Sequence, residues 1–240
     1  PINSGVFCLK KDRFQDVVWI GTDGQGVYLY SNPLYSIKSM VLSNYTEKIE
    51  RPVRAIYLDD ERTFWVGTKG NGILKIYDYE FDKNISDCRA EVLTTSNSAL
   101  SSNAVYCFAK SHRNLLWIGD EEGLTYYSYR EKRIKSIPIR IGNEDFKYIH
   151  DIYETADSEL WLASVGMGVV KARIAGTPDN PVIVDAQRYI INDGELGSNY
   201  FFTIYAENEA NLLFGNKGYV VFRYKETTNG LDPVSTHKYE

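Results

Sequence analysis

A short motif centred on a tryptophan occurs five times along this 240-residue chain, and it constrains the fold more than any other feature. It reads Val-Trp-Ile-Gly-Thr-Asp-Gly-Gln-Gly at residues 18–26 and Phe-Trp-Val-Gly-Thr-Lys-Gly-Asn-Gly at residues 64–72. Two further copies start at residues 116 and 160, and the fifth has Phe214 where the others have tryptophan. The aromatic positions lie 46, 52, 44 and 53 residues apart, so five such units account for the chain. A period of this length is typical of architectures in which each repeat is one supersecondary unit.

A second apolar motif lies shortly before each tryptophan motif. A polar turn, such as residues 59–62, connects the two, and a glycine-containing turn leads on to a third apolar strand. A looser fourth strand follows, and no stretch has the length and 3.6-residue period of a substantial helix. The second motif reads Val-Phe-Cys-Leu at 6–9, Val-Arg-Ala-Ile at 53–56, Val-Tyr-Cys-Phe at 105–108, Ile-His-Asp-Ile at 149–152 and Phe-Phe-Thr-Ile at 201–204.

Four short strands in a repeat of this length predict the blade of a β-propeller. The predicted fold class is therefore all-β, a β-propeller with five four-stranded blades in this chain. Residues 1–240 are expected to form one propeller domain or fragment. Its blades are expected at about residues 1–45, 46–97, 98–142, 143–192 and 193–240.

The tryptophans and glycines form the framework of the repeat. We predict that the four tryptophans fill the wedge between adjacent blades and are core residues, not platforms for a ligand. The small residue after the tryptophan strand lets neighbouring backbones approach closely. The chain reverses between the second and third strands, where positive φ values favour glycine. These turn glycines are Gly26, Gly72, Gly123, Gly168 and Gly218.

Composition narrows the classes of function. The net charge of −5 argues against a nucleic-acid-binding surface, because that task needs a concentrated basic field. The three cysteines include no C-x-x-C pair and the histidines, at 112, 150 and 237, lie far apart, so no metal site and no cofactor are expected. Cys8 and Cys107 occupy equivalent positions and are expected to be small buried fillers without a disulfide between them.

The Leu-Ser-Ser-Asn-Ala-Val stretch at 100–105, followed by a polar turn, Leu-Trp-Ile-Gly and a glycine turn, resembles the two-component regulator propeller repeat. The resemblance covers all five copies. It implies the periplasmic sensor region of a hybrid two-component histidine kinase, best known in gut Bacteroidetes. It also implies a seven-bladed propeller of which this chain is the final five blades, because residues 193–199 and 213–218 resemble a last blade.

The same resemblance implies a periplasmic location and a homodimer in the full receptor. Kinase, DNA-binding and membrane segments are absent from this chain, so membrane attachment would come only from other parts of the parent. No apolar run reaches the length of a membrane span, and the first residues lack the sections of a signal peptide. Since the first residue is Pro1, the chain is expected to be a piece of a longer protein.

Propeller topology predicts where a ligand binds. The connection into the first strand and the turn between the second and third strands emerge on one face of a blade, so their side chains converge there. These positions vary between copies while the framework persists, which is how a scaffold carries a site. From the first set we predict the ligand-binding residues Arg54, Tyr106, His150, Phe202, Asn103 and Asn199, and from the second Asp23, Lys69 and Glu121; Asn3, Gln25, Asn71, Glu122 and Asn216 share these positions.

The chemistry of this set suits an oligosaccharide. Aromatic faces can stack on sugar CH surfaces, and Arg54 is the best candidate for a uronic acid or sulfate. The alternative is that these residues are ordinary solvated loop residues. Asp151 stands where other copies have small residues, so it is expected to be paired or functional. The acidic turns at 59–61 and 120–122 are expected to be solvated charge, not calcium sites.

The leading hypothesis is a binding module, the ligand-sensing ectodomain of a receptor that controls transcription. No catalytic motif is present, so no catalytic residue is assigned. A propeller glycoside hydrolase or polysaccharide lyase is the alternative, although no pair of facing carboxylates stands out and the Asp-box of sialidases is missing. A structural segment that mediates dimerisation without small-molecule binding is the third reading.

Overall fold

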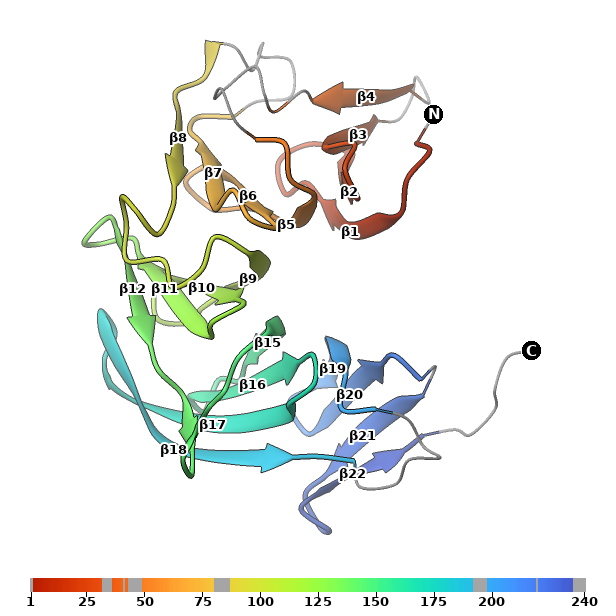
Figure 1. Cartoon of the computed structure of the whole chain (residues 1–240), viewed down its shortest axis with the longest axis vertical. Helices are drawn as coiled ribbons and strands as arrows, with labels where there is room; N and C mark the ends of the chain where they lie inside the picture. Colours follow the sequence, from red (N-terminus) through yellow and green to blue (C-terminus); the bar gives the residue numbers. More distant parts are fainter. Residues whose placement is uncertain are drawn as a thin grey trace. The chain divides into compact units, whose positions relative to one another are not determined.

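The computed structural model describes residues 2–31, 36–40, 42, 49–79, 87–191, 198–218 and 220–234. Two compact units, Pro1–Phe108 and Ala109–Glu240, make up the chain, and each is described by itself. The described residues contain β-strands and turns but no α-helix (Figure 1). The expected blade limits near residues 45 and 192, the last-blade stretch at 193–197 and His237 lie outside the described residues.

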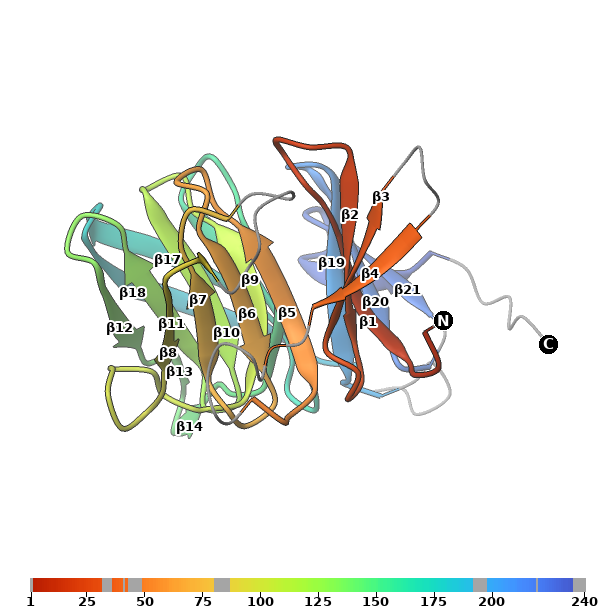
Figure 2. The ribbon, with the colours of Figure 1, turned by 90° about the horizontal axis from the view of Figure 1, so that it is seen from above.

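The first two sheets are both runs of four antiparallel strands paired in chain order (Figure 2). Side chains alternate across each strand, so a sheet presents residues of opposite parity on its two faces. The first sheet comprises β1 (Val6–Lys11), β2 (Val17–Thr22), β3 (Val27–Ser31) and β4 (Ser36–Met40), and the second comprises β5 (Val53–Leu58), β6 (Phe64–Thr68), β7 (Ile73–Ile76) and β8 (Ala90–Leu93).

Three further four-stranded sheets follow in chain order, and the limit between the two units falls within β9. A small hairpin of β13 (Arg140–Ile141) and β14 (Glu144–Asp145) stands between two of them. The described residues thus form one four-stranded sheet per repeat, which confirms an all-β propeller with five four-stranded blades. The strands are β9 (Val105–Lys110), β10 (Leu115–Asp120), β11 (Leu124–Ser128), β12 (Arg133–Ile137), β15 (Ile149–Glu154), β16 (Glu159–Ser164), β17 (Gly168–Thr177), β18 (Asn180–Tyr189), β19 (Phe201–Asn208), β20 (Asn211–Asn216), β21 (Val221–Lys225) and β22 (Gly230–Pro233).

All four tryptophans are core residues, as predicted, with at most 2% of each side chain exposed. In the first unit Trp19 packs on Phe64 of the second sheet, with ring centroids 4.4 Å apart. In the second unit Trp161 contacts Tyr224 of the following sheet at 4.5 Å. Each ring therefore joins its own sheet to the next, and truncating such a ring costs about 3–5 kcal/mol.

The alignment of Phe214 with the tryptophans is wrong. Tyr205 pairs with Leu213 as Tyr153 pairs with Trp161, so Leu213 holds the tryptophan position in the fifth sheet. Phe214 is one residue further on, and alternation turns it to the opposite face, where its ring lies 5.5 Å from Trp161. The sequence comparison failed because Phe214 directly precedes the small residue, whereas one residue separates each tryptophan from it.

Carboxylates in the first polar turns bond to the buried indoles. Trp19 Nε1 donates to Asp12 Oδ2 at 3.0 Å, and Trp65 Nε1 donates to Asp59 Oδ2 at 2.8 Å. The expectation of solvated charge is wrong for Asp59 and Asp120, which are buried. Asp120 accepts bonds from two backbone N–H groups of the turn that follows it and from the Thr125 hydroxyl of β11. These carboxylates satisfy donors that burial would otherwise leave without a partner.

The third tryptophan obtains its carboxylate from a different sheet. The turn position held by Asp12 and Asp59 in earlier repeats is Ser111, and Trp117 Nε1 donates instead to Glu154 Oε2 of β15 at 2.7 Å. The backbone N–H of His112 bonds to the same oxygen at 3.2 Å. The substitution at Ser111 is thus compensated by an acid on the next sheet, within the second unit.

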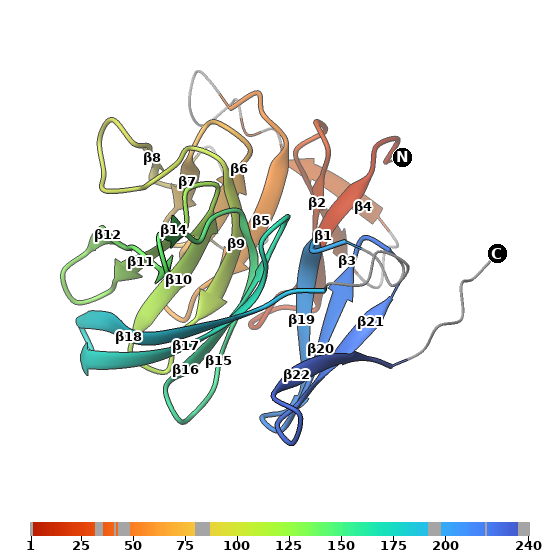
Figure 3. The same ribbon diagram turned by 60° about the horizontal axis from the view of Figure 1, so that its bottom comes forward.

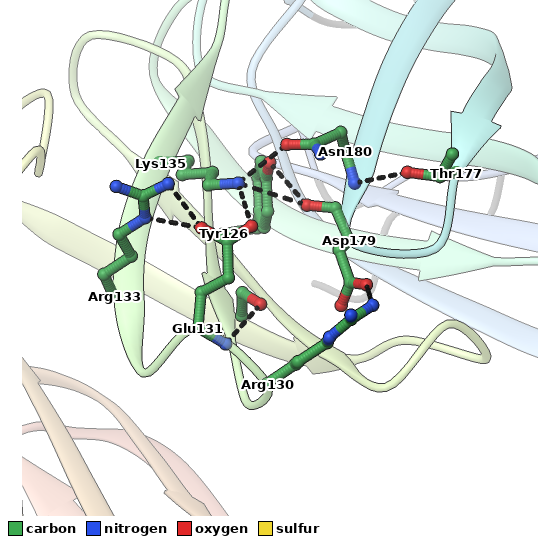
Figure 4. A network of polar contacts seen from close by, with 9 residues as sticks. Tyr126, Arg130, Glu131, Arg133, Lys135, Thr177, Asp179 and Asn180 are labelled. Atoms are coloured by element: carbon green, nitrogen blue, oxygen red, sulfur yellow. Dashed lines mark hydrogen bonds and ion pairs between the residues drawn. The ribbon is translucent and has the colours of Figure 1, made fainter.

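The hairpin of β17 and β18, in the outer part of the fourth sheet, is longer than the corresponding hairpins of the other sheets. Its tip contacts the third sheet (Figure 4). At its tip Asp179 forms an ion pair of 2.6 Å with Arg130, and its carbonyl accepts a bond from the Tyr126 hydroxyl. Lys135 Nζ donates to Asn180 Oδ1 at 2.7 Å. These contacts add a second polar link between two sheets that the hydrogen bond from Trp117 to Glu154 already joins.

Replacing Glu154 with leucine, the residue at the equivalent Leu58 position, is expected to lower the free energy of unfolding by about 3 kcal/mol, since buried donors lose their acceptor. Adding Ser111→Asp to Glu154→Leu should recover at least about 1 kcal/mol by restoring the turn carboxylate. Urea unfolding followed by tryptophan fluorescence measures both. The exposed Glu144→Leu is the control, with a change below about 1 kcal/mol; equal unfolding midpoints for the Glu154 and Glu144 variants would contradict the assignment.

Cys8 lies opposite Gly21, and burial raises the pKa of its thiol to about 11. At pH 8 its thiolate should be rarer by about two orders of magnitude than that of an ordinary cysteine. We therefore expect slow alkylation by iodoacetamide in the folded chain and fast alkylation in urea, measured by peptide mass spectrometry. The folded state favours the protonated thiol of Cys8. The stability that this preference contributes is complete below the ordinary thiol pKa and declines as pH rises toward 11. Equal alkylation rates with and without urea would contradict the conclusion that burial keeps the Cys8 thiol protonated.

Candidate functional site: the loop face of each unit

A β-bulge recurs at one position of the first strand in four sheets of the described chain. The pairing register shifts between residues 6 and 8, 53 and 55, 149 and 151, and 201 and 203. A bulged residue leaves the ladder and its side chain is re-aimed, which is why bulges gather next to functional sites. The bulged residues are Phe7, Arg54, His150 and Phe202, and Tyr106 is their counterpart in the third repeat.

In the first unit two of these side chains stack. The Arg54 guanidinium lies 3.6 Å from the centroid of the Phe7 ring. The flat face of the guanidinium stacks on the ring, so its N–H donors, which lie in the guanidinium plane, can bond to a carboxylate or sulfate. Sequence reasoning missed Phe7, although its register equivalence to Arg54, Tyr106, His150 and Phe202 was available from the motif.

The predicted convergence of the two loop sets occurs in the first unit. The backbone N–H of Asp23 donates to the Gly5 carbonyl and that of Lys69 to the Pro52 carbonyl, both at 2.9 Å. Both donors open a turn between second and third strands, and both acceptors precede a first strand. The exposed side chains of Asp23 and Lys69 therefore stand beside the connections that lead to the bulged residues.

In the second unit His150 and Phe202 meet edge to face, with ring centroids 5.3 Å apart. The neighbouring Asp151 is paired: its Oδ2 accepts a 2.7 Å bond from the backbone N–H of Ile204 and a 3.2 Å bond from the hydroxyl of Thr203. Asp151 thus fastens β15 to β19. A contact between adjacent sheets explains its carboxylate without a catalytic role.

A chain of backbone hydrogen bonds crosses the loop face of the second unit. The N–H of Tyr148 donates to the Glu121 carbonyl, and the N–H of Val165 donates to the Tyr148 carbonyl. Val165 also forms a β-bridge with Tyr200, whose carbonyl accepts from the N–H of Lys217. Tyr148 and Tyr200 each stand two residues before a bulge. Sequence reasoning missed these tyrosines and Lys217, because a lone aromatic in a connection carries no periodic signal.

The two predicted asparagines hold the loops together. Asn103 Oδ1 accepts from the Thr95 N–H, and Asn199 Oδ1 accepts from the Ile191 N–H. Their carbonyls accept from glycine N–H groups of the preceding turns, including that of Gly168. Since these groups are engaged with the protein, we leave both asparagines out of the proposed ligand contacts.

Charges on the loop face of the second unit are partly compensated. Lys147 Nζ lies 2.5 Å from Glu122, and this hydrogen bond raises the pKa of Lys147. Within the described residues no group of three Cys, His, Asp or Glu side chains is placed to hold a metal ion. All three cysteines lie in the described part, and none of them forms a disulfide there. The described residues include no helix long and apolar enough to span a membrane.

The predicted residues fall into two sets. Asp23, Arg54, Lys69, Asn103 and Tyr106 belong to the first unit, and Glu121, His150, Asn199 and Phe202 belong to the second. Each unit therefore has its own set of candidate residues, made of turn, connection and bulge residues. Figure 3 shows the first strands that carry the bulges, among them β5 in the first unit and β15 and β19 in the second.

No family model matches the chain. A stretch of 140 residues is 31% identical to translation initiation factor 6 of Saccharolobus solfataricus, covering 53% of this chain and 57% of that protein. The chain thus spans little more than half the length of this relative, and the match does not extend that protein's role to this chain.

Solved structures resemble the chain in fold. They include PorZ, a surface component of the type-IX secretion system of Porphyromonas gingivalis (14% identity, TM-score 0.65, covering 92% of this chain and 32% of that one). The extracellular domain of a putative one component system from B. thetaiotaomicron has 15% identity and a TM-score of 0.62, covering 97% and 37%. The Swd1 β-propeller domain of Myceliophteria thermophila has 11% identity and a TM-score of 0.64, covering 98% and 75%. At these identities the likeness shows the β-propeller fold alone.

The turn between β16 and β17 shapes the loop face, and its two glycines differ. Both have positive φ, but an added Cβ at Gly168 would lie 2.2 Å from the Tyr189 carbonyl oxygen, whereas Gly166 has open space. Gly166→Ala should cost only the positive-φ penalty of about 1–2 kcal/mol. Gly168→Ala should lower the free energy of unfolding by at least about 1 kcal/mol more than Gly166→Ala, because the backbone at Tyr189 must shift to make room for the Cβ. Urea unfolding compares them, and equal losses would refute the close approach.

Proposed function

We propose that this chain is a ligand-binding propeller segment of an extracytoplasmic sensor and that it recognises an oligosaccharide. The observation that carries the proposal is the recurring bulge. It presents an aromatic or cationic side chain in four sheets, which is Phe in two of them, Arg in one and His in one, while the buried core beneath it is preserved. A bulged residue does not take part in the ladder, so its identity is free to serve recognition.

The bulged residues, of which Phe7 and Phe202 are exposed and Arg54 and His150 are half-buried, suit sugars. Aromatic rings at Phe7, His150 and Phe202 offer apolar faces to the CH surfaces of a pyranose, and the stacked Arg54 offers paired N–H donors to hydroxyls or an acidic group. Tyr106 supplies a further ring at the equivalent position. A few directed polar groups among aromatic surfaces are typical of sites for small ligands.

Two observations support a sensor. The repeat resembles the two-component regulator propeller, and an extracellular domain of a putative one component system shares the fold. In this proposal the parent is a periplasmic hybrid histidine kinase that acts as a homodimer and controls transcription. Ligand binding would bias the arrangement of two protomers, and it can do so only as far as the ligand prefers one arrangement.

The enzyme and structural alternatives make different predictions. A glycosidase needs two carboxylates facing one another across the sugar. On the second loop face, Glu122 is already engaged with Lys147, and no catalytic pair stands out among the described residues. A hydrolase or lyase would convert a bound glycan to product, whereas a dimerisation segment would self-associate without binding any glycan.

The first test is a thermal-shift titration of the chain against oligosaccharides from plant and host polysaccharides. A ligand that binds only the folded state adds about 2.7 kcal/mol at a hundredfold excess over Kd, so a micromolar binder gives a clear rise in Tm. We expect a selective rise with an unchanged glycan. Product formation would favour the hydrolase or lyase, and no shift with any glycan would leave only the structural reading.

Variants then locate the contacts. Arg54→Ala or His150→Ala is expected to weaken glycan binding about tenfold by calorimetry, because each removes a presented group. Arg89→Ala is a matched control: Arg89 also stacks on an aromatic ring, that of Tyr77, but it lies away from the bulges. The exposed His112→Ala is the control for His150. If all four variants bind alike, the bulge positions are not the contacts.

A further inference from the structure

Tyr148 and Tyr200 distinguish the second unit from the first. The equivalent positions in the first three repeats are Gly5, Pro52 and Ala104, none of which has an aromatic ring. Tyr148 is 41% exposed and Tyr200 is 40% exposed, so both rings are accessible to a ligand.

Backbone contacts place Tyr148 and Tyr200 on either side of Val165. Val165 donates its N–H to Tyr148 and forms a bridge with Tyr200, so the two tyrosine backbones flank the same residue. Two strand spacings place them about 10 Å apart. Tyr148 has φ of 56°, which is strained for a bulky residue and is typical of positions kept for function. The separation is of the same order as the repeat of two linked pyranose rings.

A positive charge stands at one end of this pair. Lys217 Nζ lies 5.4 Å from the centroid of the Tyr200 ring, and the backbone N–H of Lys217 donates a hydrogen bond to the Tyr200 carbonyl. No carboxylate of the described residues forms an ion pair with Lys217, whereas Lys147 on the other side is neutralised by Glu122. An anionic group stacked against Tyr200 would therefore find its counter-charge at Lys217.

We propose that Tyr148, Tyr200 and Lys217 form a subsite for an acidic oligosaccharide, with a uronic acid or sulfated sugar on Tyr200 and the second sugar along from it on Tyr148. The inference rests on the proposed function and specifies its ligand class. The acidic group of the sugar pairs with the Lys217 ammonium, and the sugar CH faces lie on the tyrosine rings, whose faces carry partial negative charge.

Calorimetry of the whole chain tests this with two matched pairs of probes. They are trigalacturonic acid with its fully methyl-esterified form, and a sulfated galactose disaccharide with its desulfated, uncharged form. We expect an acidic probe to bind about tenfold more tightly than its uncharged partner. Lys217→Gln should abolish that preference and leave the uncharged probe unaffected, and Tyr200→Leu should weaken both about tenfold.

Two controls guard against indirect effects. Tyr205→Leu removes an equally large and more exposed ring from β19, the strand that follows Tyr200, and Lys132→Gln removes an exposed lysine from a turn of the same unit. Neither should alter binding, and urea midpoints should show that all variants fold.

The outcomes separate the two proposals. Binding of an acidic probe that survives Lys217→Gln and Tyr200→Leu would overturn the subsite and leave the oligosaccharide sensor intact. Equal affinity for the charged and uncharged probes would overturn the choice of an acidic sugar. No binding of these probes or of any glycan in the thermal-shift panel would overturn both.

Discussion

Burial of a tryptophan between two sheets is the interaction on which the rest of the structure depends. Trp19 and Trp161 each contact rings of the following sheet, so a four-stranded sheet that cannot bury its apolar face alone gains a partner. The indole N–H must find an acceptor in that dry interface. Asp12 and Asp59 supply one from the preceding turn, and Glu154 supplies one from the next sheet.

The two ways of satisfying the indole show what the repeat must preserve. A carboxylate is needed at a point in space, not at a point in the sequence, because the cost arises from an unpaired buried donor. When the turn residue is Ser111, an acid on β15 reaches the same place. Individual residues can therefore differ between repeats while the packing around the buried indole is preserved.

Recognition is separated from this framework by the β-bulge. The tryptophan strand is buried and paired on both sides, so a substitution there disturbs two sheets. A bulged residue of the first strand is outside the ladder, so Arg54 in one repeat and His150 in another leave the pairing unchanged. The same device explains how sheets of nearly constant construction present different chemistry on their loop faces.

Much of the candidate site was predictable from the sequence, since Arg54, Tyr106, His150 and Phe202 share a position in a visible motif. Phe7 belonged to the same motif and was overlooked. Tyr148, Tyr200 and Lys217 were not predictable in this way, because their common surface arises from hydrogen bonds between different sheets. Asn103 and Asn199 were chosen for their polarity, yet their amides bond to the backbone that shapes the loops.

The sequence by itself determined the fold class, the number of blades and the tryptophan core, because strand period, turn glycines and repeat spacing are local properties. Tertiary structure decided that Leu213, not Phe214, holds the tryptophan position, and that Asp59, Asp120 and Glu154 are buried acceptors. The physical reason is that strand pairing sets which face a side chain takes. A shift of one residue reverses that face, and only the partner strand specifies the register.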